Sequence, residues 1–135
     1  MKKRILVTGG AGVRLTLSCD RLPYSGESAL GESYSYSPDL RGAAAALALS
    51  RLGVDSVLLS SVGSDSNGTK LISMLSDGGV DTRFMVRVPQ RTTSLSVTLR
   101  ETEAGERTII YPGASEFMSE SAVEEAFNCY RDGVL

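Results

Sequence analysis

Glycines directly after the first apolar run are the residues of this chain whose spacing suggests phosphate chemistry. Residues 5–12 read Ile-Leu-Val-Thr-Gly-Gly-Ala-Gly, an order typical of a strand and turn that bring the backbone close to a pyrophosphate at a helix N-terminus. A dinucleotide site needs a third small residue three positions after Gly12, where Leu15 stands. The next residues alternate in polarity, so we expect a strand there and keep an NAD(P)-binding enzyme only as an alternative.

Composition excludes several other kinds of chemistry. The 135 residues contain no His, which rules out a His general base, a His-bound metal and a Ser-His-Asp triad within them. Cys19 and Cys129 are far apart and form no CxxC motif, so free thiols are expected. The net charge of −2 favours neither nucleic acid nor a membrane partner, and no apolar run approaches the roughly 20 residues of a membrane span. A cytoplasmic protein is therefore expected.

The periodicity of apolar residues predicts a single domain of mixed α/β class. Apolar runs and alternation indicate strands at 4–8, 15–19, 28–37, 57–62, 94–99 and 108–111, and helices at 42–52, 67–76 and 119–130. Gly53 is placed to end the first helix, and Ser119 to cap the last one. The order of strands and helices predicts parallel pairing, and the extra alternating segments predict a small antiparallel piece at one edge.

Several short motifs follow one another in an order that carries more information than any one of them. They are Asp20-Arg21-Leu22-Pro23, Gly26-Glu27, Leu30-Gly31-Glu32-Ser33, Arg41-Gly42-Ala43-Ala44, Ser50-Arg51-Leu52-Gly53, Val62-Gly63-Ser64-Asp65-Ser66-Asn67-Gly68, Gly79-Val80-Asp81-Thr82, Thr93-Ser94, Gly105-Glu106-Arg107 and Pro112-Gly113-Ala114. Together they resemble the landmarks of the ribokinase (PfkB) family of carbohydrate kinases over nearly the whole chain. For 62–68 itself we expect a structural role, with Asp65 or Asn67 near a helix start.

This resemblance implies the N-terminal portion of a ribokinase-like α/β/α sandwich with a small antiparallel β lid. Residues 1–135 would form one partial domain, with lid segments at about 14–38 and 92–112. Residues 132–135 resemble the start of the next core strand of the family.

The activity implied is phosphoryl transfer from MgATP to a carbohydrate hydroxyl. In the family a Gly-Ala-Gly-Asp turn supplies the catalytic base and an anion hole. The present 135 residues contain no such turn and no adenine-binding region. We therefore expect no catalytic residue and no cofactor site in this chain, and no kinase activity from it alone.

The resemblance also locates the positions that contact the sugar. Carried over to this sequence, these substrate-binding positions are Arg14, Asp39, Arg41, Gly42 and Ala44. The family has Asp at the position of Arg14, Gly-Gly at Asp39-Leu40, and Asn at both Ala44 and Gly12. Arg41 keeps the basic character of its position, and Gly42 is unchanged.

These replacements alter the ligand that we expect. Exchanging a carboxylate for a guanidinium at Arg14 inverts the local charge and removes every acceptor. An unmodified neutral sugar would then bind poorly, whereas Arg14, Arg41 and Arg107 would suit an acidic or phosphorylated sugar if they converged. Tyr34 and Tyr36 could either stack on a sugar or cover a sheet edge.

A second interpretation makes the chain a non-catalytic binding or dimerisation module derived from a sugar kinase. In the family the lid is a small sheet that can pair with a second lid. An open sheet edge favours such pairing, so a homodimer through the lid or through an open edge is expected under this interpretation.

Overall fold

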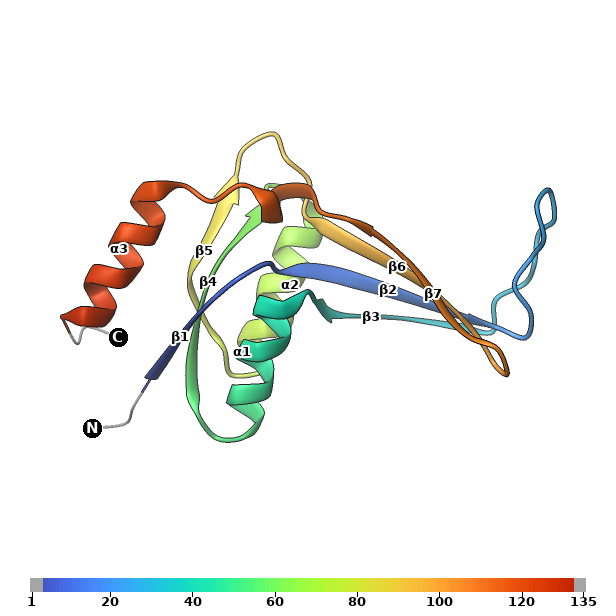
Figure 1. Ribbon diagram of the computed structural model, residues 1–135, viewed down its shortest axis with the longest axis horizontal. Helices are drawn as coiled ribbons and strands as arrows, with labels where there is room; N and C mark the ends of the chain where they lie inside the picture. The colour runs from blue at the N-terminus through green and yellow to red at the C-terminus, as the bar shows by residue number, and fades with distance from the viewer. Residues whose placement is uncertain (1–3, 133–135) are drawn as a thin grey trace.

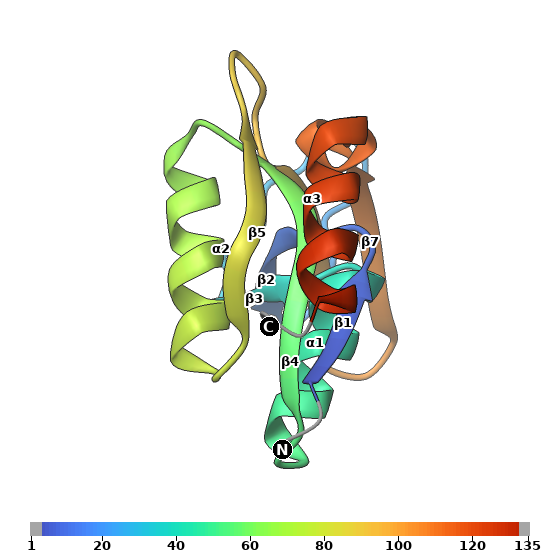
Figure 2. The same ribbon diagram turned by 90° about the vertical axis from the view of Figure 1, so that its left-hand side faces the viewer.

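A three-stranded parallel sheet forms the body of the molecule in the computed structural model, which describes residues 4–132. Its strands, in spatial order, are β1 (Arg4–Thr8), β4 (Asp55–Gly63) and β5 (Asp81–Val88). The crossovers are α1 (Arg41–Arg51) and α2 (Ser66–Asp77) on one face, and α3 (Glu120–Arg131) lies on the other, as Figure 2 shows. The predicted parallel pairing and the α/β class are thus confirmed.

The central strand β4 is covered on both faces. Every residue from Ser56 to Gly63 is buried, which is typical of a parallel strand between two helical layers. Leu58 and Val62 pack with Leu71 and Leu75 in the main hydrophobic cluster. Full burial of each leucine side chain contributes about 1.5–3 kcal/mol, so this cluster anchors α2 against the sheet.

The sequence predicted both ends of each of the three α-helices to within one residue. The first helix, expected at 42–52, ends at Arg51. Gly53 lies just beyond it, and its φ of 79° is the left-handed conformation that follows a helix C-terminus. The Ser119 hydroxyl accepts a hydrogen bond from Ala122 N at 3.2 Å, which confirms the predicted N-cap of α3.

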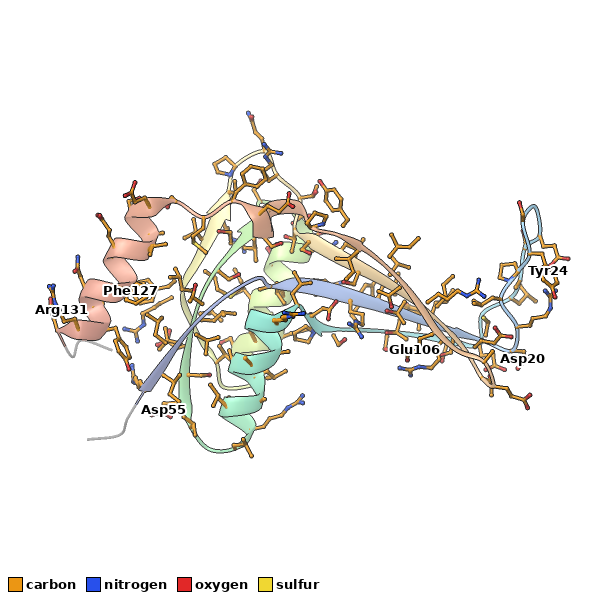
Figure 3. The ribbon with its side chains drawn as sticks, viewed as in Figure 1. Asp20, Tyr24, Asp55, Glu106, Phe127 and Arg131 are labelled. Carbon is orange, nitrogen blue, oxygen red and sulfur yellow. The ribbon has the colours of Figure 1, made fainter. Side chains whose placement is uncertain are left out.

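A second sheet of four strands projects from the body toward the right of Figure 1. In spatial order it contains β3 (Ser33–Asp39), β2 (Gly12–Cys19), β6 (Ser94–Glu101) and β7 (Gly105–Tyr111). The connection between β2 and β3 lies at the far end, where Figure 3 shows Asp20 and Tyr24. Strands β6 and β7 pair as an antiparallel hairpin, which agrees with the small antiparallel piece expected from the alternating segments.

The expectation of an antiparallel lid was only partly correct. The outer pairs are antiparallel, but the central pair β2–β6 is parallel, with Gly12 opposite Ser94. Both strands continue directly from strands of the parallel body, β2 from β1 and β6 from β5. They therefore enter the second sheet from the same end and run in the same direction.

Two strand assignments also differ from the sequence prediction. The sequence analysis did not predict strand β5, in which Arg83 and Arg87 interrupt the apolar pattern. Strand β3 begins at Ser33, and the preceding residues 28–32 are not in a strand.

The glycine-rich turn leads into a strand, as expected. Residues 9–11 connect β1 directly to β2, so no helix N-terminus follows the glycines at which a pyrophosphate would bind. Within residues 4–132, no helix is both long and apolar enough to cross a membrane.

Two buried serines of β4 provide a test of this packing. Ser56 Oγ donates to Ala46 O at 2.8 Å, whereas Ser60 Oγ has no hydrogen-bond partner among the described residues. An unpaired buried hydroxyl costs about 1–3 kcal/mol. We expect Ser60→Ala to raise the free energy of unfolding by about 1 kcal/mol, and its matched control Ser56→Ala to lower it by about 1 kcal/mol. Urea unfolding measures both, and equal losses in the two variants would contradict the packing described.

Candidate functional site

Arg14 and Asp39 form an ion pair at the base of the second sheet. Arg14 Nη2 lies 2.7 Å from Asp39 Oδ1. In the register of β2 and β3, Gly12 is opposite Asp39 and Arg14 is opposite Ser37, so the two charged residues are diagonal neighbours on one face. Two positions that separately depart from the family pattern are therefore in direct contact with each other.

The pKa of Asp39 is lowered from its usual value. Burial alone would raise it, but the nearby Ser96 hydroxyl, the Leu40 N–H and the Arg14 guanidinium together outweigh burial. The Ser96 hydroxyl is close enough to act on the carboxylate electrostatically, although it forms no well-oriented hydrogen bond to it. The carboxylate is therefore ionised at neutral pH and neutralises the charge of Arg14.

The arginines proposed for an acidic ligand do not converge. Arg14 is opposite Ser96 and therefore shares a face with it, whereas Arg107 is opposite Leu99. Because Ser96 and Leu99 are three residues apart on one strand, Arg14 and Arg107 lie on opposite faces of the sheet. Arg41 is exposed at the start of α1.

Three polar atoms around the ion pair lack a hydrogen-bond partner among the described residues. They are Arg14 Nε, Asp39 Oδ2 and Ser96 Oγ, and all three are buried. Ser96 is 1% exposed and lies directly across from Arg14. One donor, one acceptor and one group that can do both are thus gathered on adjacent strands, an arrangement that suits the hydroxyl groups of a ligand.

Position 42 must be glycine, because the start of α1 lies very close to the backbone that connects β1 to β2. A Cβ at Gly42 would lie 2.6 Å from the carbonyl carbon and oxygen of Gly9. The amides of Gly42 and Ala43 donate to Gly10 O at 3.0 and 3.2 Å. These N-terminal amides of α1 are therefore already engaged. Ala44, another carried-over position on this turn, is exposed.

Gly12 is also explained by packing. A Cβ at Gly12 would lie 2.8 Å from both Ser94 Cβ and Ser94 O. The structure therefore leaves no room at this position for a larger side chain, such as the Asn that the resemblance implies for the family.

Asp65 joins three elements, as the expected structural role of 62–68 requires. Asp65 Oδ1 accepts from Gly68 N at 3.1 Å and from Thr93 Oγ1 at 2.6 Å, and Asp65 Oδ2 accepts from Thr93 N at 3.0 Å. Thr93 Oγ1 in turn accepts from Gly63 N at 3.0 Å. Burial would raise the pKa of Asp65, but these donors hold it below its usual value. The end of β4, the start of α2 and the start of β6 are thereby fixed together.

Comparison with known proteins decides the family. A sequence model described as "pfkB family carbohydrate kinase" matches residues 2–135. The chain belongs to this family. A PfkB relative, the ribokinase of Bacillus subtilis (strain 168), is 35% identical over 83 residues, which are 62% of this chain and 28% of that protein. The ribokinase of Lactococcus lactis subsp. lactis is 27% identical over 133 residues, covering 98% of this chain and 44% of the relative.

Solved structures agree with the PfkB assignment at the level of the fold. The structure of Arabidopsis thaliana ribokinase complexed with ribose and ATP superposes with a TM-score of 0.77 at 24% identity, covering 92% of this chain and 42% of that one. The present PfkB chain thus spans less than half the length of these relatives.

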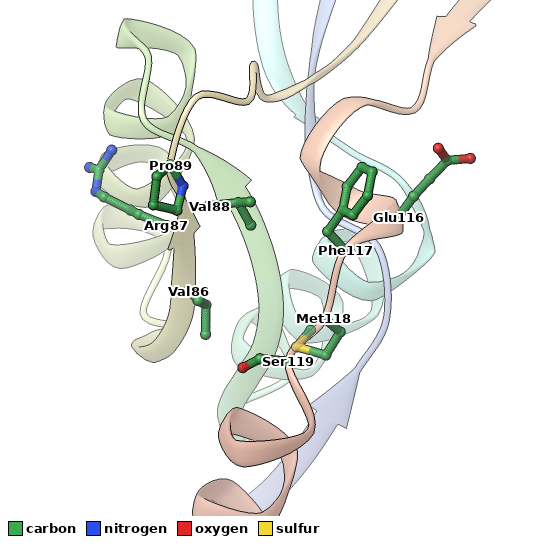
Figure 4. A pocket seen from close by; sticks show the side chains of 8 residues that line it. All are labelled: Val86, Arg87, Val88, Pro89, Glu116, Phe117, Met118 and Ser119. Atoms are coloured by element: carbon green, nitrogen blue, oxygen red, sulfur yellow. The ribbon is translucent and has the colours of Figure 1, made fainter.

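A separate hollow of about 430 Å³ in this PfkB chain is not marked by any of the sequence motifs (Figure 4). It lies between the end of β5 and the segment that joins the 3-10 helix η1 (Gly113–Glu116) to α3. Val86, Val88 and Met118 contribute apolar walls, and the Arg91 guanidinium lies 4.1 Å from the centroid of the Phe117 ring. The hollow shares no residue with the Arg14–Asp39 site.

The lowered pKa of Asp39 predicts a dependence of stability on pH. Because its folded pKa lies below the unfolded value of about 3.9, the stabilisation is present above that value and is lost as the pH falls through the folded pKa. We expect Asp39→Asn to lower the free energy of unfolding by about 1–2 kcal/mol at pH 7 and by much less at pH 2. Chemical unfolding at both pH values measures this difference.

The matched control is Asp77→Asn, at an exposed position at the end of α2. It should change stability by less than about 0.5 kcal/mol at either pH. A loss for Asp39→Asn that is the same at pH 7 and pH 2 would contradict the ion pair.

Proposed function

We propose that this chain is the sugar-binding and lid portion of an ATP-dependent carbohydrate kinase, which transfers phosphate to a sugar hydroxyl. Membership of the PfkB family supports the reaction class. The observation that carries the binding role is the set of three unpaired polar atoms around the Arg14–Asp39 pair. The second sheet, with segments at about 14–38 and 92–112, is the lid in this proposal.

The ligand proposed for this site is a neutral polyol such as a pentose. Asp39 neutralises Arg14, which removes the main reason to expect an acidic or phosphorylated sugar. A ligand hydroxyl can accept from Arg14 Nε and donate to Asp39 Oδ2, while the Ser96 hydroxyl can do either. The Arabidopsis relative is described with ribose and ATP, which makes ribose the first sugar to test. Arg41, Gly42 and Ala44 would border the ligand from α1.

The transfer step itself is proposed to need residues outside these 135. No Gly-Ala-Gly-Asp turn occurs in the sequence, and the family uses that turn to deprotonate the attacking hydroxyl and to stabilise the developing charge. In this proposal the chain orients the sugar and its lid excludes water, whereas MgATP binds to polypeptide beyond it.

Both Cys19 and Cys129 are free, which suits the reducing cytoplasm proposed as the location of this chain.

Calorimetric titration with ribose tests the binding role. We expect saturable binding that Ser96→Ala weakens about 5- to 10-fold, because one hydrogen bond to the ligand is lost. The control Ser64→Ala, at an exposed position, should bind like the parent chain. Ribose 5-phosphate should bind no more tightly than ribose, and no phosphorylated product should form with MgATP. Absence of binding by ribose and by other neutral polyols would contradict the proposal.

A second candidate function, a dimerisation module, is supported by the outer strands of the lid. All residues of β7 are exposed, and the side chains of Ile109 and Tyr34 are 80% and 68% exposed. Strands β3 and β7 are the two edges of their sheet. Exposed apolar side chains on an open edge favour association with a second copy.

Sedimentation equilibrium tests this second function. We expect a concentration-dependent dimer that Ile109→Lys converts to monomer, because an ammonium on the edge opposes burial. Leu30→Lys is the matched control, since Leu30 is 93% exposed outside any strand, and it should leave the dimer intact. A parent chain that stays monomeric at concentrations of several hundred micromolar would argue against dimerisation.

A further inference from the structure

The hollow beside the end of β5 has apolar side chains on two sides. Val86 and Val88 alternate with Met85, which is buried in the main hydrophobic cluster, so the two valines point to the opposite face of the sheet. Phe117 and Met118 form the other side, and they remain 40% and 36% exposed. The volume of about 430 Å³ lies within the range of pockets that bind small molecules.

The side formed by Phe117 and Met118 is fixed by contacts with the rest of the fold. Ser61 Oγ of β4 donates to Met118 Sδ at 3.6 Å, and Phe117 N donates to Ala114 O at 3.0 Å. Helix α3 begins directly after this segment, but the only residue that it buries is Ala126. The hollow is therefore a feature of a held backbone segment that the following helix leaves uncovered.

Arg91 brings a positive charge to the Phe117 side of the hollow. Its guanidinium carbon lies 4.1 Å from the centroid of the Phe117 ring, which is a cation–π contact. Arg91 O accepts from Ser64 N at 3.1 Å, so the backbone of Arg91 is fixed as well. Within residues 4–132, no hydrogen bond or ion pair engages the guanidinium. Its N–H groups are therefore available to a planar anion such as a carboxylate.

The charged side chains among the lining residues are directed elsewhere. Arg87 Nη2 donates to Thr69 Oγ1 of α2 at 3.1 Å, and Figure 4 shows the side chains of Arg87 and Glu116 pointing away from the hollow. Ser119 Oγ is engaged as the N-cap of α3, where it accepts from Ala122 N. The walls are thus apolar, with the guanidinium of Arg91 beside them.

We propose that this hollow binds a small amphipathic carboxylate, with its carboxylate on Arg91 and its apolar body between Val88 and Met118. A sugar does not suit these walls, because its hydroxyl groups would lose hydrogen bonds to water without finding partners there. An uncharged apolar molecule would gain only from burial, whereas an anion also gains charge-assisted hydrogen bonds. This second site does not depend on the proposed function, since the hollow shares no residue with the Arg14–Asp39 site.

Calorimetric titration with hydrocinnamate, and with hydrocinnamyl alcohol as its uncharged counterpart, tests the site. We expect saturable binding of hydrocinnamate, about fivefold or more tighter than that of the alcohol, because only the anion pairs with Arg91. Arg91→Gln should abolish this difference by weakening hydrocinnamate and leaving the alcohol nearly unchanged. The matched control Arg51→Gln, at an exposed position at the end of α1, should bind both compounds like the parent chain.

NMR spectra of the backbone amides locate the bound compound. We expect saturating shifts in residues 86–91 and 116–119. Met118→Gln keeps the length of the side chain but adds an amide to the apolar wall, so it should weaken both compounds about threefold. No saturable binding at millimolar concentrations, equal affinity for the two compounds, or shifts confined to other residues would each overturn the site. A dimer in sedimentation equilibrium that Met118→Gln dissociates would assign the hollow to a second copy of the chain and would also refute the proposal.

Discussion

The approach of α1 to the glycine turn between β1 and β2 is the constraint on which the rest of the molecule depends. Gly10 O receives hydrogen bonds from both Gly42 N and Ala43 N, and this contact exists because Gly42 has no side chain. It fixes the start of α1, and with it the end of β3, beside the point where the chain leaves the parallel sheet. Asp39 and Leu40 are thereby held next to β2, where Arg14 lies.

At that point lie the residues that the resemblance identifies as departures from the family pattern, and in the structure they fit one another. Arg14 and Asp39 compensate each other in charge, and Gly12 makes room for Ser94. A partly buried ion pair of this kind adds little stability beyond the cost of removing its charges from water. Its clearer consequence is chemical, because it leaves a donor and an acceptor next to Ser96 without adding net charge. Under the proposed function, such a site would bind hydroxyl groups and would give no advantage to an anion.

The sequence alone was enough to predict features that depend on residues close to one another along the chain. Ser119 and Gly53 marked helix ends because capping and positive φ are local properties, and 62–68 marked a strand end and a helix start for the same reason. The order of the motifs predicted the family, and the order of the expected strands and helices predicted the α/β class. The partner of Asp65 was not predictable, because Thr93 is 28 residues away and is brought close by the register of two sheets. The parallel β2–β6 pair was missed because alternation carries no information about strand direction.

The same limitation applied to the site. Sequence comparison treated Arg14 and Asp39 as two separate losses of sugar contacts, since their contact exists only in the β2–β3 register. Their coupling is the central claim of this account, and a double-mutant cycle with exchanged charges tests it most directly. Arg14→Asp and Asp39→Arg should each lower the free energy of unfolding, and the double variant should recover about 1–2 kcal/mol of the summed loss. A double variant whose loss equals the sum of the two single losses would contradict the ion pair and the hydroxyl site built on it.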